Sequence, residues 1–551
     1  MGFLYNKSKS ETFRQYFSQA NEIEKQYNQY HINQRQIDIK QSKYLFTKKN
    51  IGGLPLSWNK DKDVVSIDQT DSHSLIIGPT GSKKTRLIAM PAVRILGNAG
   101  ESMIISDPKA EIYIRTADYL EQLGYQVEVI NLRNPHYSIG WNPLTIPYRL
   151  YCQGNIDKAY EFANDVAQNM VAEGVSNEPF WENSAASFLF GLIMLLFMFC
   201  NDRNLAEEDV NFRNIFELRN FMFLGNDMQI RSSEIWKYAQ RDSYIRNSLI
   251  GTIETAKDTR GGILSTFDQA VRNISIQPSL LNMLSTNDIN WNEFLEKKKV
   301  LYLIMPDEKT SYHKLVSLFV KQSYEYFISL AQQGLYEGDA DTGFLPIRIN
   351  YILDEFSSLP TIRDFPAMIT AARSRNIRFS LFIQSKHQMQ QRYSKETETI
   401  LANCTNWIFL TTRELSLLKD ISDLCGVKEQ KPILSVAQLQ RLDKEDGEAL
   451  ILSGRNKPYI AQLPDIELYD KGKFKVVQLV KKDFRGRDII DLSDFKQKDM
   501  KNPFMPSSNL STEEIDVMIK DIDKKLKELD EEEKKQQKMQ EREAEEQEDD
   551  N

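Results

Sequence analysis

The sequence is poor in cysteine and lacks a long uninterrupted apolar run. Its four cysteines are scattered through 551 residues without C-x-x-C spacing, so we expect neither a metal cluster nor a disulfide framework, and a reducing compartment fits best. The longest apolar run, Phe188 to Cys200, is interrupted by Gly191 and is shorter than the roughly 20 residues of a membrane span. We expect a buried helix there. Residues 1–50 are polar, so no signal peptide is predicted.

An excess of basic charge is also absent, because the formal net charge is -8. Proteins that cover nucleic acid with their whole surface are basic, so a DNA site in this chain would be a local basic patch or a channel. With 41% hydrophobic residues, the chain can bury a large core, and its length predicts two or more domains.

The stretch from Ser74 to Thr85 organises the rest of the chain, because an apolar run stops at Gly78 and a helical pattern follows Thr85. A loop that leads into a helix directs backbone N–H groups and the positive end of the helix dipole at one point, which suits a phosphate. In the P-loop pattern G-x-x-x-x-G-K-[ST], Lys84 reaches the β and γ phosphates and the Thr85 hydroxyl holds Mg²⁺. The predicted nucleotide-binding residues are Gly78, Pro79, Thr80, Gly81, Ser82, Lys83, Lys84 and Thr85.

Lys83 departs from this pattern, because it stands where the second glycine belongs. If the position needs a positive φ, a lysine costs on the order of 1–2 kcal/mol there and its side chain can crowd the nucleotide. The loop taken alone also fits a Gly/Ser/Lys turn that joins a strand to a surface helix.

A pair of acids follows a second apolar strand, residues 347–353. The Walker B arrangement has this form, with Asp354 in the Mg²⁺ shell and Glu355 orienting or deprotonating the attacking water. An acidic strand end that faces solvent is the alternative interpretation.

A neutral amide, Gln384, ends a further strand at residues 379–383, where it can sense the γ-phosphate or position water. Basic residues surround this strand, and we expect one arginine, Arg375, to act in trans on a neighbouring subunit's nucleotide. The others could contact a DNA backbone, or form an ordinary basic surface; the group is Arg373, Arg375, Arg378, Lys386, Arg392 and Lys395.

The pattern of strands and helices predicts an α/β fold in several parts. Alternating strand and helix signals indicate a parallel sheet in residues 51–154 and again in 296–470, the two parts of a nucleotide-binding domain. Strand signals vanish between them, which predicts an all-helical domain at 155–295. Residues 1–50 form a polar and basic arm with helical periodicity in places, either a docking arm or a solvated leader. Residues 471–551 form an extension whose acidic tail is expected to be disordered.

Five motifs in this order resemble those of the type IV coupling proteins of bacterial conjugation, the TraG/TraD-type ATPases, and the likeness covers roughly residues 55–465. The motifs are Gly78 to Thr85, Asp107-Pro108-Lys109-Ala110-Glu111, Asn142-Pro143-Leu144, Leu353-Asp354-Glu355-Phe356 and Gln384-Ser385.

The resemblance implies a RecA-like nucleotide-binding domain, interrupted by an all-alpha domain, that binds ATP and Mg²⁺. It also implies a homo-hexameric ring that handles single-stranded DNA and a relaxase at the cytoplasmic face of a type IV secretion channel. By motif, Lys84 and Thr85 bind phosphate and Mg²⁺, Asp354 and Glu355 serve metal and water, and Gln384 couples the nucleotide state to motion.

Two departures from the family pattern lead to alternatives. Members usually begin with transmembrane helices and this sequence shows none, so we expect peripheral recruitment to the inner face of the cell membrane by a separate membrane protein. Lys83 leaves open a substrate-docking adapter that hydrolyses little. An FtsK-like DNA translocase is a third possibility, against which the Asp107-Pro108-Lys109 segment and the helical insertion argue.

Overall fold

A computed structural model of the protein describes residues 27–31, 52–171, 179–337, 343–471 and 473–492, apart from 307, 310–311, 429, 455, 483, 485 and 487. All of these residues belong to one compact unit, Met1–Phe495. The acidic tail predicted for residues 512–551 lies outside the described residues.

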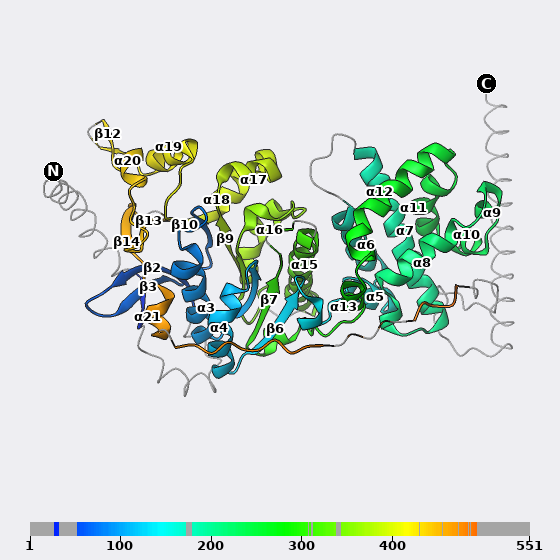
Figure 1. Ribbon diagram of the computed structural model, residues 1–551, viewed down its shortest axis with the longest axis horizontal. Helices are drawn as coiled ribbons and strands as arrows, with labels where there is room; N and C mark the ends of the chain where they lie inside the picture. The colour runs from blue at the N-terminus through cyan, green and yellow to red at the C-terminus, as the bar shows by residue number, and fades with distance from the viewer. Residues whose placement is uncertain are drawn as a thin grey trace, which may run out of the picture. The chain divides into compact units, whose positions relative to one another are not determined.

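A nine-stranded sheet in the order β14-β13-β10-β4-β9-β8-β5-β7-β6 forms the centre of this unit (Figure 1). Every neighbouring pair from β10 to β6 is parallel, whereas β13 and β14 add an antiparallel edge. The α/β fold predicted from the sequence is confirmed. In the order of the sheet, the strands are Tyr459–Gln462, Glu448–Ser453, Cys404–Phe409, His73–Ile77, Ile377–Ile383, Ile349–Leu353, Ser102–Asp107, Lys299–Ile304 and Gln126–Asn131.

Helices cover both faces of the sheet, which explains why its central strands are apolar without alternation. On β4 the side chain of Ile76 packs with helices α3 (Met90–Ala99) and α4 (Glu111–Gln122). Its neighbours Leu75 and Ile77 belong to the other core, with α15 (His313–Glu337) and α16 (Phe365–Ala372). Successive strand residues face opposite sides, so one strand supplies both cores.

An all-helical insertion lies between β6 and β7, as predicted (Figure 1). Its central helix, α7 (Pro179–Arg203), contains the apolar run and packs against α6, α11 and α12. With 25 residues, α7 is long and apolar enough to cross a membrane, but 78% of its most apolar window is buried inside the protein, as in a core helix. The insertion comprises α6 (Ile156–Val171), α7, α8 (Phe212–Met222), α9 (Asp227–Arg231), α10 (Glu234–Ala239), α11 (Ser243–Ile253), α12 (Lys257–Ser275), α13 (Pro278–Met283) and α14 (Glu293–Glu296).

The Asn142-Pro143-Leu144 motif joins this insertion to the sheet domain. The Asn142 side-chain amide donates to the Val210 carbonyl at 2.7 Å, and its oxygen accepts the Leu144 N–H at 3.0 Å. The buried Gln322 amide on α15 donates to the Pro143 carbonyl at 2.7 Å. The motif is therefore a structural junction.

A second, three-stranded sheet has the order β1-β3-β2, with β1 (Asn28–His31), β2 (Leu54–Asn59) and β3 (Val64–Asp68). Tyr27 belongs to the N-terminal arm, for which the sequence predicts helical periodicity in places, but it precedes the strand β1. Its hydroxyl donates to Ser453 Oγ at 2.9 Å, at the end of β13. Residues 1–26 and 32–50 of the arm lie outside the described residues.

The first part of the C-terminal extension runs from the sheet domain to the helical insertion (Figure 1). The Val477 carbonyl accepts the Tyr113 hydroxyl at 3.1 Å, and the Ile490 N–H donates to the Asn214 side chain at 3.2 Å. Ile490 is buried there. The described part of the extension is therefore a strap across both parts of the fold.

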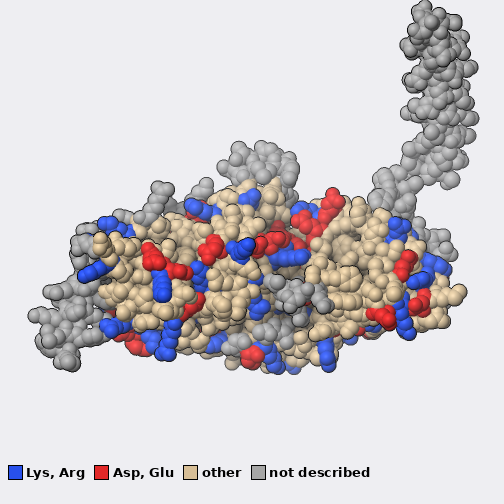
Figure 2. Space-filling view, turned by 90° about the horizontal axis from the view of Figure 1, so that it is seen from above, with Lys and Arg blue, Asp and Glu red and all other residues tan. Residues whose placement is uncertain are grey.

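Charged side chains of both signs are interspersed on the face shown in Figure 2. The formal net charge of -8 likewise gives no excess of positive charge. Broad attraction of nucleic acid to this face is therefore not expected.

Candidate active site

The loop after β4 has the shape of a phosphate cradle. Gly81 has φ 78°, and a side chain at Gly78 would meet the Ser82 hydroxyl at 2.5 Å, so both positions suit glycine. The Lys84 ammonium is buried and donates to the Gly78 carbonyl at 2.5 Å, across the mouth of the loop. A helical segment begins directly at Thr85, with one π-turn before α3. The Leu87 N–H already donates to the Lys83 carbonyl at 2.8 Å, so the N–H groups that a helix start leaves for a phosphate are those of the residues before Leu87.

Lys83 adopts the left-handed conformation expected at the glycine position, with φ 66°. Its side chain does not crowd the loop, because its ammonium turns outward and pairs with the Glu445 carboxylate at 2.5 Å. The substitution therefore retains the backbone shape of the cradle at a conformational cost of about 1–2 kcal/mol.

The two predicted acids lie beside this loop. Asp354 follows β8, and its carboxylate accepts the Thr85 hydroxyl at 3.2 Å. Glu355 has φ 56° and accepts the side-chain amide of Gln384 at 2.6 Å. Parallel β4, β9 and β8 are adjacent in the sheet, and their carboxyl ends meet at one edge. The structure thus brings Lys84, Thr85, Asp354, Glu355 and Gln384 together.

Two further polar residues, Ser106 and Asp107, come to the same edge from β5. The Ser106 hydroxyl donates to the Asp354 carbonyl at 2.8 Å. The fully buried Asp107 carboxylate accepts the Tyr113 N–H at 2.8 Å, which caps α4. Asp107 was not among the site residues predicted from the sequence. Helix α4 begins at Glu111, after the left-handed residue Ala110.

The buried carboxylates of the site have too little positive charge near them to stabilise their ionised forms. Burial raises the pKa of Asp354 to about 6, assisted by the nearby Glu355 charge and opposed by Lys84. Burial also raises the pKa of Asp107 to about 7, and the charge of Asp354 adds to the effect. The pKa of Lys84 is lowered, again because of burial. A divalent cation beside Asp354 would relieve this imbalance.

Replacing Asp107 with asparagine should stabilise the protein more in alkaline than in acidic solution. The pKa of Asp107 in the folded protein is about 7, above the ordinary value of about 3.9. As pH rises between these two values, the free energy of unfolding of the wild type therefore falls by roughly 1.4 kcal/mol for each pH unit. Asparagine cannot ionise, and its oxygen can still accept the Tyr113 N–H. The gain in melting temperature, measured by calorimetry, should be larger near pH 8 than near pH 5. Equal gains at both pH values would contradict the buried-charge argument.

The predicted arginine, Arg375, is not brought to these residues. It precedes β9, whose opposite end carries Gln384, and its guanidinium donates to the Ala371 carbonyl at 2.9 Å and to the Ser374 hydroxyl at 2.8 Å. Action in trans stays a prediction. Arg373, another of the predicted basic group, pairs with Asp71 at 3.0 Å.

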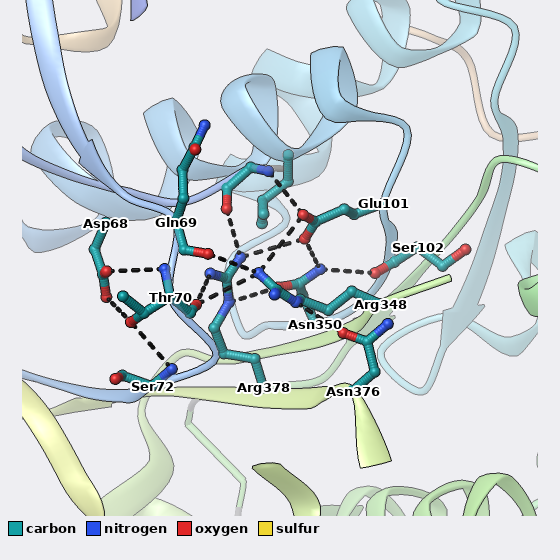
Figure 3. A network of polar contacts seen from close by, with 12 residues as sticks. Asp68, Gln69, Thr70, Ser72, Glu101, Ser102, Arg348, Asn350, Asn376 and Arg378 are labelled. Atoms are coloured by element: carbon teal, nitrogen blue, oxygen red, sulfur yellow. Dashed lines mark hydrogen bonds and ion pairs between the residues drawn. The ribbon is translucent and has the colours of Figure 1, made fainter. Parts of the chain in front are cut away.

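Arg378 must be withdrawn from the candidates for DNA or nucleotide contact, because it is buried at the amino ends of the strands (Figure 3). Its guanidinium pairs with Glu101 at 3.3 Å and donates to the Asn350 oxygen at 2.9 Å. Glu101 also accepts the Gly52 N–H at 2.7 Å. The network connects three strands with the loop before β2 and serves the fold.

Comparison with solved structures identifies proteins of the same fold. Plasmid coupling protein TrwB in complex with the non-hydrolysable ATP analogue ADPNP has a TM-score of 0.56 and 15% identity, covering 83% of this chain and 97% of that chain. The trigonal form of the bacterial conjugative coupling protein TrwBdeltaN70 in complex with sulphate also has a TM-score of 0.56, with 14% identity over 82% and 96%. TrwB in complex with ADP and Mg²⁺ has 0.52, with 14% identity over 76% and 89%. At these identities the likeness shows the fold.

Among curated protein sequences, none matches this chain. A family model described as type IV secretory system conjugative DNA transfer matches residues 17–431. This match spans most of the chain and confirms the resemblance drawn from the five motifs. The chain belongs to the family of type IV secretory system conjugative DNA transfer proteins.

Proposed function

We propose that this protein is a P-loop ATPase that delivers single-stranded DNA, with its bound relaxase, to a conjugative type IV secretion channel. The observation that carries the proposal is the hydrogen bond between Thr85 and Asp354, which lie 269 residues apart in the sequence. It joins the phosphate-binding loop to the acid pair, and a nucleoside triphosphate needs both.

The donor set fits Mg²⁺ held together with a nucleotide. Among the described residues, no three His, Cys, Asp or Glu side chains form a complete metal site. Mg²⁺ commonly uses one or two protein oxygens, completing its shell with phosphates and water, and the Thr85 hydroxyl and Asp354 carboxylate supply such oxygens. When bound, the ion would neutralise charge that develops on the β and γ phosphates.

Lys84, Glu355 and Gln384 each have a separate role in hydrolysis. The Lys84 ammonium leaves the Gly78 carbonyl and donates to the phosphates, which are stronger acceptors. The Glu355 carboxylate orients the attacking water and accepts its proton. Gln384 holds that carboxylate at 2.6 Å, so a change at the γ-phosphate is transmitted to β9. The arginine that completes the site, for which Arg375 is our candidate, would come from the adjacent subunit of a homo-hexamer.

Membership of the family supports the proposed partners. TrwB is named as a conjugative coupling protein, and we propose the same role here, with recruitment to the inner face of the cell membrane through a membrane protein of the channel. Pulldown of a relaxase together with ATPase activity stimulated by single-stranded DNA would test this role. A protein that hydrolyses ATP without response to DNA and binds no relaxase would contradict it.

Lys84→Ala should weaken ATP binding by roughly 10- to 100-fold, because a charge-assisted hydrogen bond to phosphate contributes about 1.5–3 kcal/mol. Titration of a fluorescent ATP analogue measures the effect. Lys158→Ala is the control, since Lys158 is an exposed lysine on α6, in the helical insertion, where it pairs with Glu161 at 2.6 Å. Equal affinities for wild type and Lys84→Ala would remove the loop from the nucleotide site.

The alternative, an adapter that does not hydrolyse ATP, depends on Lys83. Because the Lys83 side chain points to Glu445 and not into the loop, we expect wild type and Lys83→Gly to hydrolyse saturating ATP at similar rates. Turnover that appears only in Lys83→Gly would favour the adapter.

A further inference from the structure

Ser385, the residue directly after Gln384, makes hydrogen bonds in two directions. Its hydroxyl donates to the Glu414 carboxylate at 2.8 Å and accepts the His387 N–H at 3.1 Å. The second contact caps helix α17 (Lys386–Tyr393). A serine hydroxyl has a single proton to donate, and in this protein that proton is used on Glu414.

The hydrogen bond between Ser385 and Glu414 spans the strand that carries the phosphate-binding loop. In the sheet, β4 lies between β9 and β10. Both neighbours run parallel to β4 and stay paired with it as far as its last residue, Ile77. Ser385 follows β9 and Glu414 follows β10. Their hydrogen bond therefore connects the two sides of β4 close to the point where the loop begins.

Glu414 is held in place by its own turn. It directly precedes helix α19 (Leu415–Leu424) and is half-buried. Its N–H donates to the Thr412 hydroxyl at 3.2 Å, and its other carboxylate oxygen accepts the Ser416 hydroxyl at 3.4 Å. Because both oxygens of the carboxylate have partners, Ser385 is bonded to an acceptor whose position is defined.

The opposite side of the same segment is bonded to the loop that carries the acid pair. The Gln384 amide donates to the Glu355 carboxylate at 2.6 Å, and the Ser357 hydroxyl donates to the Gln388 side-chain oxygen at 3.1 Å. Residues 384–388 are therefore held between the acid pair on one side and Glu414 on the other. The Gln384 amide can reach Glu355 only while the backbone of this segment stays in place.

We propose that Ser385 and Glu414 are positioning residues, which hold Gln384 against Glu355 and thereby direct the Glu355 carboxylate at the attacking water. This inference rests on the function proposed above, in which Glu355 is the general base. A displacement of about 1 Å in a catalytic arrangement can reduce the rate about 100-fold. Loss of the hydrogen bond between Ser385 and Glu414 should therefore slow hydrolysis while the affinity for ATP is retained.

The test measures single-turnover hydrolysis at saturating ATP and the affinity for a fluorescent ATP analogue, using the full chain. Glu414→Leu, which has a similar size but no acceptor, should slow hydrolysis by about 10- to 100-fold with unchanged affinity. Glu414→Gln should hydrolyse ATP almost like wild type, because its amide oxygen still accepts the Ser385 hydroxyl. Ser385→Gly should be as slow as Glu414→Leu; glycine is tolerated at the start of a helix, so this variant removes the hydroxyl with little loss of stability.

A double variant tests whether Glu414 acts through Gln384. Gln384→Leu removes the amide that holds Glu355 and should itself slow hydrolysis. Adding Glu414→Leu to it should cause no further loss, because the two residues act in one chain of contacts. A double variant whose loss is the product of the two single losses would overturn the proposal.

The matched control is Glu207→Leu, because Glu207 is also half-buried but pairs with Arg149 at 2.7 Å in the helical insertion. Its rate should equal that of wild type. Rates like wild type in both Glu414→Leu and Ser385→Gly would overturn the proposal and leave the ATPase assignment intact. The same conclusion would follow if Glu414→Gln were as slow as Glu414→Leu, or if Glu414→Leu weakened ATP binding as much as it slowed hydrolysis. If wild type neither binds nor hydrolyses ATP, the proposed function fails and this inference fails with it.

Discussion

Glu355→Gln is expected to reduce ATP hydrolysis by roughly 100- to 10,000-fold, the range for loss of a general base, while ATP binding is retained. Glutamine has the size of glutamate, and its amide oxygen can still accept the Gln384 hydrogen bond, which is 2.6 Å long in the wild type. That oxygen cannot take a proton from water at neutral pH. The substitution also removes a negative charge that raises the pKa of Asp354, so metal binding should not suffer.

Single-turnover hydrolysis at saturating ATP, together with titration of a fluorescent ATP analogue, separates the chemical step from binding. The matched control is Glu398→Gln, because Glu398 is an exposed carboxylate that pairs with Lys386 at 3.3 Å, away from the phosphate loop. It should hydrolyse ATP like wild type. Rapid hydrolysis by Glu355→Gln would show that another group activates the water.

The phosphate-binding loop, the acid pair and Gln384 could be predicted because each comes directly after an apolar strand. In a parallel sheet the carboxyl ends of the strands share one edge, so Thr85 and Asp354 can be predicted to lie close together although they are far apart in the sequence. The helical insertion could be predicted for a similar reason, since loss of strand signals is a local property of residues 155–295.

Contacts between loops that are far apart in the sequence could not be predicted in this way. Glu445 lies 362 residues from Lys83, and nothing in the local pattern of either residue indicates the other. Lys83 could therefore be recognised as a departure from the P-loop pattern, but the direction of its side chain could not. The strap around Val477 and Ile490 was missed because its few apolar residues have no helical or strand period.

For Arg378, the local sequence pattern led to a wrong prediction. Basic residues before a strand suggested an exposed surface, but Arg378 is the second residue of a fully buried strand. Its partner Glu101 lies 277 residues away, before β5. A buried charge needs a partner, and the sequence does not identify which acid provides it.

Arg378→Met is therefore expected to destabilise the protein by about 3–5 kcal/mol, because it leaves Glu101 buried without its closest charged partner. Arg348 is the other nearby cation, but its guanidinium lies 3.8 Å from the Glu101 carboxylate, beyond hydrogen-bond distance. Chemical denaturation and differential scanning calorimetry measure the loss. Arg373→Met is the matched control from the same segment, because its ion pair with Asp71 is largely exposed, and exposed pairs contribute about 0–1 kcal/mol.

The double variant Arg378→Met with Glu101→Met tests whether the loss of stability comes from an unpaired buried charge or from lost packing. If the cost of Arg378→Met comes from the uncompensated Glu101 carboxylate, removing that carboxylate as well should recover much of the stability, as replacement of whole buried ion pairs often does. The Gly52 N–H and the Asn350 side-chain amide, which donate to Glu101 at 2.7 Å and 2.8 Å, would then lose that acceptor, so recovery should be incomplete by about 1–3 kcal/mol for each group. A double variant less stable than Arg378→Met would mean that Glu101 holds the loop before β2 chiefly through its hydrogen bonds. An Arg378→Met variant as stable as Arg373→Met would contradict the structural role assigned to the pair.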